Sequence, residues 1–408
     1  MDEVASRQCV RRRRDRDNVP VDVLQGRDAV QDVRPPYHVV RCRLPPSSLP
    51  VVVPNGRRKQ QLRRRLLDWY ARHARDLPWR RTRDPYAIWV SEIMLQQTQV
   101  GAVIPHYQRF LSAFPTVEAL ADATQEDVLR LWEGLGYYRR AQQLHRSAAV
   151  IVSEHGGHFP RDLATARSLP GIGRYTAGAI LSIAFDQPLP ILEANTIRLW
   201  SRVTGYRGDP RTASGQQFLW DCAAVLVPPQ QAGAFNQAAM EVGSEICPSR
   251  SPCCDRCPVA ELCTARRESS QQEIPARARK PRYQELHEVA FVVCRRGRVL
   301  VRRCLPHERW AGLWDFPRLT VPAETCRDPQ PSLMDRLREC TGIRGTITDQ
   351  VATMRYGVTR FRITLACYRV RALEGHLNAD HLRWIVPQEL HRLPLSVTGR
   401  RISHCLVS

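Results

Sequence analysis

The sequence predicts a mainly α-helical domain followed by a smaller α+β domain. Apolar residues recur at helical spacing from Arg57 to Cys263. A polar segment with two prolines follows over residues 266–284, and alternating apolar patterns appear after it. We therefore expect a helical domain over residues 56–265, a linker over 266–284 and an α+β domain over 285–408.

Individual elements follow from the same periodicity. Leu62, Leu66, Leu67 and Tyr70 share one face of a first helix. Later helices of this domain are expected at 86–99, 101–114, 124–135, 138–155, 163–169, 176–185 and 195–204. After the linker, the apolar runs 289–293 and 299–301 flank a turn and predict a β-hairpin, with a helix at 332–340 and a strand at 361–370.

The net charge of the 408-residue chain is +21, which favours a polyanionic partner, most simply nucleic acid. Only two of the basic residues, Lys59 and Lys280, are lysines, so compositional bias is the competing explanation. No secretory signal and no membrane-spanning run is apparent. We expect an intracellular monomer with reduced thiols, in the cytoplasm or nucleoid of a bacterium or in the nucleus or mitochondria of a eukaryote.

The first 55 residues are rich in Arg, Asp, Val and Pro and show no sustained periodicity. We expect a disordered tail or a start codon placed too far upstream. The arginine run 11–14 leaves a nuclear signal or a DNA-contacting arm as alternatives.

Four cysteines near the end of the helical domain have the spacing C-x6-C-x2-C-x5-C and predict a metal centre: Cys247, Cys254, Cys257 and Cys263. Zinc sites normally use two C-x2-C pairs, and only one is present here. A [4Fe–4S] cluster accepts four cysteines from one compact loop, so we predict that cluster at 247–263, with zinc or chance as alternatives. Cys253 is an extra neighbour that could replace Cys254, but only Cys254 gives the x6 spacing.

Two features suggest chemistry on a phosphate-bearing ligand. The turn Leu169-Pro170-Gly171-Ile172-Gly173 between two expected helices would point backbone N–H groups outward to bind a phosphate. Glu92 stands in an otherwise apolar stretch, where desolvation would raise its pKa. Glu193 follows the turn closely and is a second candidate acid.

Several segments together resemble one family, the MutY-type adenine DNA glycosylases of the helix-hairpin-helix, endonuclease III superfamily. The resemblance covers residues 62–263, including the turn, the cysteine spacing and the segments 75–80 (RDLPWR), 89–100 (WVSEIMLQQTQV), 134–141 (GLGYYRRA) and 235–241 (FNQAAME). The α+β domain resembles, more weakly, the family's Nudix-like domain. The resemblance implies a monofunctional enzyme of base excision repair that removes adenine opposite 8-oxoguanine or guanine in duplex DNA and leaves an abasic site.

Roles for single residues also come from the resemblance. It implies that Glu92 protonates adenine and then activates water, that Glu193 stabilises the oxocarbenium-like sugar, and that Asn195 bonds to that acid. Tyr175 stands where relatives that nick the strand carry a Schiff-base lysine, which argues against a lyase. The residues expected to contact DNA or the base are Trp89, Leu95, Gln96, Gln97, Tyr137, Gly171, Gly173, Gln237, Glu241, Thr359 and Arg360, with core packing or solvated faces as alternatives for several.

The chain departs from the family pattern at two places, whereas a third region, in the Nudix-like domain, agrees with the family in lacking the residues of the hydrolases. Glu193 replaces the usual Asp and is one methylene longer, which opens the alternative of a DNA mismatch-binding or lesion-binding protein without catalysis. Val358-Thr359-Arg360 replaces Phe-Ser-His in the lesion-sensing loop, so the preference for 8-oxoguanine is less secure than adenine removal. The region around Arg338-Glu339 lacks the paired glutamates of Nudix hydrolases, so we expect recognition without hydrolysis there.

Overall fold

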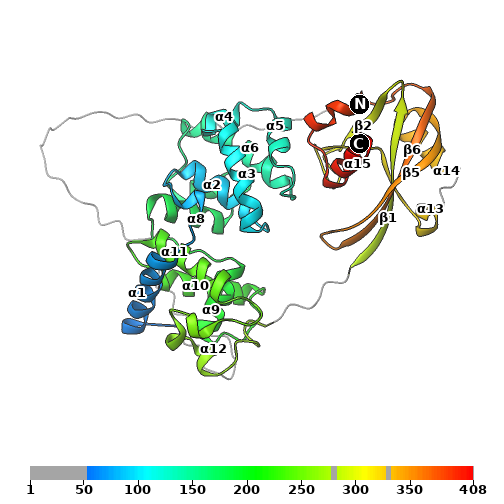
Figure 1. Ribbon diagram of the computed structural model, residues 1–408. Helices are drawn as coiled ribbons and strands as arrows, with labels where there is room; N and C mark the ends of the chain where they lie inside the picture. Colours follow the sequence, from blue (N-terminus) through cyan, green and yellow to red (C-terminus); the bar gives the residue numbers. More distant parts are fainter. Residues whose placement is uncertain (1–52, 277–282, 328–331, 408) are drawn as a thin grey trace, which may run out of the picture. The chain divides into compact units, whose positions relative to one another are not determined.

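The structure is a computed structural model that describes residues 53–276, 283–327 and 332–407. The expected tail, with its arginine run, lies almost entirely outside these residues, as does the middle of the expected linker. Residues 53–276 form the predicted α-helical domain (Figure 1). Its helices are α1 (Gly56–His73), α2 (Pro85–Leu95), α3 (Val100–Ala113), α4 (Val117–Ala121), α5 (Gln125–Leu131), α6 (Arg139–His155), α7 (Leu163–Ser168), α8 (Arg174–Phe185), α9 (Ala194–Thr204), α10 (Ala213–Leu226), α11 (Ala232–Glu241) and α12 (Thr264–Arg267).

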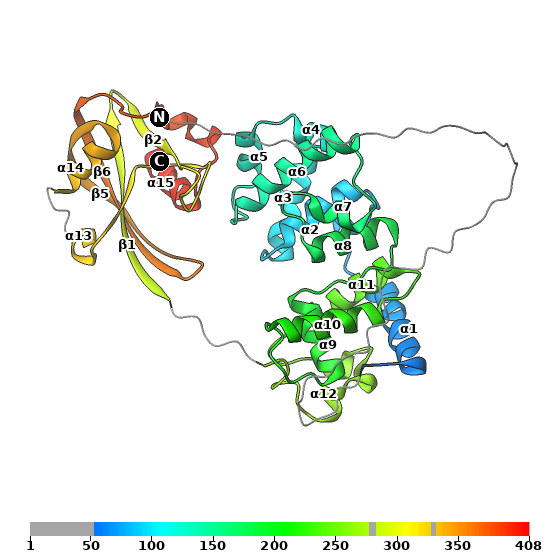
Figure 2. The same ribbon diagram turned by 180° about the vertical axis from the view of Figure 1, so that it is seen from behind.

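The helices pack around two apolar cores. One core gathers buried side chains from α2 to α8, and the other is built by α1, α9, α10 and α11. Figures 1 and 2 show these two groups of helices from opposite sides. Tyr175, in the first turn of α8, packs against both cores and therefore marks their junction.

The helices expected from periodicity are present, with shifted ends. Both α2 and α5 end earlier than expected: α2 stops at Leu95 rather than Gln99, and α5 stops at Leu131 rather than Leu135. Gln97 adopts a positive φ of 57°, which an α-helix does not allow, and the guanidinium of Arg140 binds the carbonyls of Ile93, Met94 and Gln96. A side chain from another helix therefore ends α2, which local periodicity does not report.

The segment that follows the cysteine loop remains part of the helical domain. The expected linker began at residue 266, but α12 runs through Arg267 and the chain stays packed to Ile274. Ile274 is 1% exposed, and its carbonyl accepts a hydrogen bond of 2.9 Å from Nε of Arg202. The expectation of an unattached linker is wrong for residues 266–274, because a buried apolar side chain anchors them.

Residues 283–407 form the predicted α+β domain around a mixed sheet with the strand path β3-β2-β1-β6-β5. β4 and β7 pair with β1 and β2 off this path. The expected hairpin is confirmed as β1 and β2, with Arg296 and Gly297 at positive φ in its turn. The elements are β1 (Gln284–Arg295), β2 (Arg298–Arg303), β3 (Trp314–Asp315), β4 (Arg318–Val321), α13 (Ala323–Arg327), α14 (Ser332–Thr341), β5 (Ile343–Val358), β6 (Phe361–Gly375), β7 (Leu382–Ile385) and α15 (Val397–Val407).

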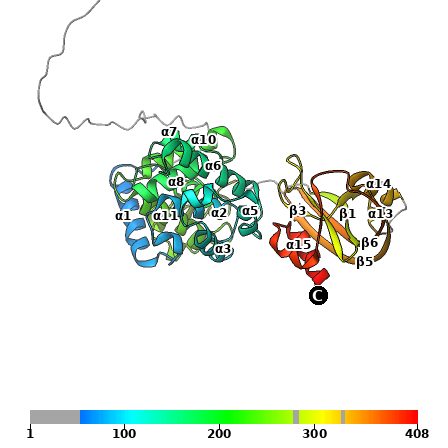
Figure 3. The same ribbon diagram turned by 90° about the horizontal axis from the view of Figure 1, so that it is seen from above.

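Helices cover both faces of the central strands, as Figure 3 shows for α14 and α15. Val289, Phe291 and Val293 of β1 pack with α14, whereas Ala290 and Val292 pack with Ile402 of α15. Because side chains alternate between the faces of a strand, a continuous apolar run supplies both layers. Strand β5, which pairs with β6 over most of its length, was not expected; three register shifts in this pairing interrupt its apolar alternation.

Candidate functional site

One pocket in the helical domain brings both candidate acids together. Its lining includes Glu92 of α2, Tyr175 of α8 and Glu193 just before α9. The pocket has a volume of about 180 Å³ and lies at the junction marked by Tyr175. Expected base contacts Leu95 and Gln237 line it too, so residues distant in sequence share one concave site.

Glu92 is buried, with 5% of its surface exposed, and the hydroxyl of Tyr175 donates a hydrogen bond of 2.7 Å to its Oε2. Burial raises the pKa of Glu92 to about 7, the negative charge of Glu193 adds to the rise, and the Tyr175 hydrogen bond opposes it. A carboxylic acid that is half protonated near neutral pH is suited to donate a proton.

Glu193 is the N-cap of α9 and uses both carboxylate oxygens for this role. Oε1 accepts from the N–H of Thr196 and Oε2 from the N–H of Asn195, each at 2.8 Å. The N–H of Glu193 in turn donates to the hydroxyl oxygen of Thr196, which completes a capping box. Burial raises the pKa of Glu193 above its ordinary value, and the backbone N–H groups of Asn195 and Thr196, which favour the ionised form, offset only part of this rise.

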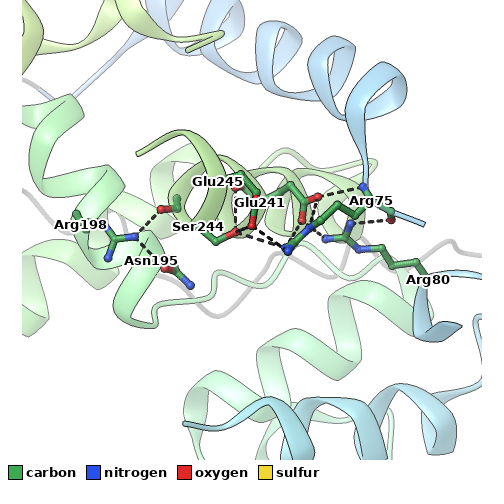
Figure 4. Close-up of polar contacts among 8 residues, drawn as sticks. Arg75, Arg80, Asn195, Arg198, Glu241, Ser244 and Glu245 are labelled. Atoms are coloured by element: carbon green, nitrogen blue, oxygen red, sulfur yellow. Dashed lines mark hydrogen bonds and ion pairs between the residues drawn. The ribbon is translucent and has the colours of Figure 1, made fainter. Parts of the chain in front are cut away.

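Asn195 meets Glu193 through its backbone rather than its side chain. Its side-chain oxygen accepts a hydrogen bond of 2.9 Å from Arg198 (Figure 4). Arg198 also donates to the carbonyls of Gly243 and Cys247. Arg198 thereby joins α9, which Glu193 caps, to Cys247, the first cysteine of the 247–263 loop. Sequence reasoning missed Arg198, whose only signal was its place one turn after Asn195.

Glu241 lies in the pocket wall but is held by arginines. It is 1% exposed, and Arg75 and Arg80 form ion pairs with it at 2.8 and 2.6 Å (Figure 4). Burial would raise the pKa of Glu241, but the hydrogen bonds from both arginines overcome it and lower the pKa to about 2. The alternative of a solvated face is therefore wrong, and a permanently charged cluster closes this side of the pocket.

The turn before α8 has the expected hairpin form, with α7 and α8 on either side. Gly171 has a φ of 78°, and a Cβ there would lie 2.7 Å from Cβ of Gln143. Gly173 has an ordinary φ of −88°, and a Cβ there would meet nothing within 4 Å. Gly171 is thus required by the fold, whereas Gly173 leaves open space before the N-terminus of α8.

The residues expected to enter DNA differ in exposure. Trp89 is 1% exposed and packs against Tyr86 and Phe159, so the expectation of a direct DNA contact is wrong for it. The helix α2 is buried continuously from Tyr86 to Met94, which explains this. Tyr137 is 52% exposed, so the alternative of core packing is wrong there. Leu95 and Gln96 are partly buried and Gln97 is exposed.

All four predicted cluster cysteines line a second cavity, formed mainly by the 247–263 loop and α9. Cys253 is exposed and lies outside that lining, so the geometry favours Cys254 as the ligand, in agreement with the spacing argument. Arg202 of α9 donates to the Cys247 sulfur at 3.2 Å, and Gln271 donates to the Cys254 sulfur at 3.6 Å. Among the described residues, no three His, Cys, Asp or Glu side chains are grouped as ligands of a single ion.

The loop that replaces Phe-Ser-His is the tip of the β5–β6 hairpin. Thr359 has a φ of 51°, and both Thr359 and Arg360 are exposed. The Arg360 guanidinium lies over the Phe361 ring, 5.2 Å from its centre. Thr359 and Arg360 are therefore exposed at the tip of the long β5–β6 hairpin, where they are available to contact another molecule.

Comparisons with known proteins agree with the fold. The model of the HhH-GPD superfamily of base excision DNA repair proteins matches residues 90–223, and that of the NUDIX domain matches 289–404. Rat adenine DNA glycosylase is 44% identical over 269 residues, which cover 63% of this chain and 51% of that protein. The human adenine DNA glycosylase is 43% identical over 399 residues, covering 83% of this chain and 72% of that one.

A solved thermostable thymine-DNA glycosylase is 29% identical with a TM-score of 0.46, over 52% of this chain and 97% of that chain. The chain spans about half the length of the rat relative. Within the described residues, no helix is long and apolar enough to cross a bilayer.

The helical fold, the hairpin and the paired acids define a helix-hairpin-helix protein of base excision DNA repair. With the human relative covered over 72% of its length at 43% identity, the chain belongs to the adenine DNA glycosylase family.

Proposed function

We propose that this chain hydrolyses the N-glycosidic bond of adenine mispaired with 8-oxoguanine or guanine in duplex DNA. The observation that carries the proposal is the pocket shared by Glu92 and Glu193, with the Tyr175 hydroxyl bonded to Glu92. Family membership supports the same reaction.

The chemistry follows from the two acids. Protonated Glu92 donates its proton to the leaving adenine as the bond between the base and the sugar carbon breaks. The ionised carboxylate of Glu193 stabilises the oxocarbenium-like sugar. Glu92, now a carboxylate, takes a proton from water while the hydroxide joins the sugar, so the products are free adenine and an abasic site. Tyr175 holds Glu92 and supplies no amine, so no strand-nicking Schiff base is expected.

We propose that the four cysteines hold a [4Fe–4S] cluster with a structural role. Their side chains line one cavity, and the donor set is all thiolate. Arg202 donates to the Cys247 sulfur, the kind of hydrogen bond that stabilises ligand charge. The cluster would cross-link four points of a loop with little regular structure, and Arg202 joins this loop to α9.

We propose that the hairpin grips the DNA backbone and that the second domain reads the base opposite adenine. The space before α8 suits a phosphate at a helix N-terminus, and Gly171 and Gly173 would line that approach. Base removal requires flipping, for which Leu95, Gln96, Gln97 and Tyr137 are the proposed wedge, with Gln237 and Glu241 at the base edge. Thr359 and Arg360 are the proposed contacts to the opposite base. We also propose that the chain acts as a monomer, in the compartment that holds the DNA.

An excision assay tests the function. The full chain is incubated with duplexes that place adenine opposite 8-oxoguanine, guanine or thymine, followed by hot alkali. We expect strand breaks at adenine opposite the first two bases, and no break in any duplex would overturn the proposal. The variant Glu193→Asp distinguishes this enzyme from the alternative, a non-catalytic mismatch-binding protein. Such a binding protein would gain activity only on this substitution, whereas an enzyme adapted to Glu193 would already be active without it.

A further inference from the structure

Arg140, in the first turn of α6, hydrogen-bonds to two separate loops through one guanidinium. Its Nη1 donates to the carbonyls at the end of α2, and its Nη2 donates to the Thr98 hydroxyl and to the loop before α6. The acceptors are Ile93 O (2.7 Å), Met94 O (3.0 Å), Gln96 O (2.5 Å), Thr98 Oγ1 (3.1 Å), Leu135 O (3.1 Å) and Gly136 O (3.3 Å).

Each of the two loops carries an exposed side chain on a strained backbone. Gln97 has a φ of 57° and Tyr137 a φ of 45°, in the left-handed region that is unfavourable for residues other than glycine. Such conformations persist only where surrounding contacts impose them. The Arg140 guanidinium supplies these contacts, and it also lies 5.6 Å from the centre of the Tyr137 ring.

The first loop is also part of the pocket. Leu95 and Thr98 both line it, and Thr98 is bonded directly to Arg140. A shift of the guanidinium would therefore move the pocket rim together with the Tyr137 loop. Burial lowers the pKa of Arg140 to about 10, so the side chain keeps its charge at neutral pH.

We propose that Arg140 is the positioning residue that holds the two base-flipping loops, 95–98 and 134–137, in one fixed arrangement. The inference rests on the proposed glycosylase function and names the side chain on which base extrusion depends. Lysine cannot replace it, because an ammonium has three donors and no plane to lie against a ring, whereas the guanidinium serves six acceptors.

The test uses the full chain with Arg140→Lys and, as matched control, Arg130→Lys on the exposed face of α5, where Arg130 pairs only with Asp127 among the described residues. Base flipping is followed by the fluorescence of 2-aminopurine placed in the duplex at the adenine position. We expect the flipping rate of Arg140→Lys to fall on the order of 10-fold to 100-fold, as small misplacements in active sites do. Arg130→Lys should match the unchanged chain.

A double-mutant cycle with Tyr137→Ala separates positioning from general stability. If Arg140 acts by holding the Tyr137 loop, the double variant should lose less than the product of the two single losses. Losses that multiply, or an Arg140→Lys variant that flips the base normally, would overturn the proposal. Should Arg140→Lys fail to fold, Thr98→Val removes one acceptor and should slow flipping in the same direction.

The two proposals can fail separately. Fluorescence reports extrusion of the base and does not require cleavage of the glycosidic bond. A chain that flips the base but never cuts it would contradict the proposed function and still show the effect of Arg140→Lys.

Discussion

The hydroxyl of Tyr175 donates a 2.7 Å hydrogen bond to Glu92, which lies 83 residues earlier in the chain. This bond joins the first turn of α8, directly after the hairpin, to the buried helix α2. Tyr175 thus connects the hairpin, which we propose binds the DNA backbone, to Glu92, the proposed proton donor. The following variants test the parts of this arrangement separately.

Glu92→Gln should abolish most excision and leave the fold intact. The amide keeps the shape of the side chain and can accept from Tyr175, but it cannot deliver a proton. General acid catalysis contributes about 10²- to 10⁴-fold, so we expect a loss of that size in single-turnover excision. Affinity for mispaired duplex should change little, and equal losses of binding and rate would contradict the assignment.

The excision rate should fall on the alkaline side of neutrality. Burial raises the pKa of Glu92 to about 7, so the acid form predominates below that pH and the carboxylate above it. Only the acid form donates a proton to adenine, hence the rate declines tenfold per pH unit well above pH 7. A single-turnover pH profile measures this, and a rate that rises through pH 8 would exclude Glu92 as the donor.

Glu193→Gln and Glu193→Ala should separate charge from helix capping. Gln keeps an oxygen that can accept from the α9 backbone, so its free energy of unfolding should stay close to that of the unchanged chain. Ala removes the cap and should lower the free energy of unfolding by about 1 kcal/mol. Both remove the charge and should reduce excision by about 10²- to 10³-fold. Urea unfolding and single-turnover assays on both variants provide the measurements.

Gly171→Ala and Gly173→Ala form a matched pair in the hairpin. The first places a methyl group at positive φ and 2.7 Å from Gln143, so the free energy of unfolding should fall by about 1–2 kcal/mol. The second meets no protein atom within 4 Å and should leave unfolding nearly unchanged. We expect Gly173→Ala to weaken duplex binding nonetheless, because its methyl group occupies the phosphate approach. If Gly173→Ala bound duplex DNA normally, the hairpin would not be part of the DNA interface.

Cys254→Ser and Cys253→Ser test the ligand set. Cys254 lines the cavity with the other three cysteines, whereas Cys253 is exposed outside it. We expect Cys254→Ser to lower the iron and sulfide content and the visible absorbance of the purified protein. Cys253→Ser should retain both. The reverse pattern would assign the ligand to Cys253, and zinc in place of iron in the unchanged chain would overturn the cluster itself.

Much of the architecture could be predicted because its signals are local. Helical periodicity located α2, α3, α6 and α8, and the alternation after residue 284 indicated the second domain. Strand β5 was not predicted, although Ala352, Met354, Tyr356 and Val358 alternate with polar residues or glycine, because irregularities in its pairing with β6 interrupt the alternation before Ala352.

The site residues also divide into those that local signals predict and those whose surroundings depend on the fold. Trp89 and Glu241 looked like surface contacts because motif membership says nothing about which side chains the neighbouring helices cover. In the fold, Trp89 is buried in α2, and the ionised Glu241 is paired with Arg75 and Arg80, more than 160 residues away in the chain. The truncation of α2 at Leu95 likewise depends on Arg140, which lies 44 residues beyond Gln96.

The helical and α+β division, the cysteine spacing, the glycine turn and the two candidate acids could be identified from the amino-acid sequence, because the patterns that indicate them are local. The pocket shared by Glu92, Tyr175 and Glu193, the cap that Glu193 forms on α9, and the hydrogen bonds from Arg140 to two loops become apparent only in the folded chain. These relations join residues far apart along the chain. Packing between helices, burial and long-range hydrogen bonds create them, and they also set the pKa of Glu92.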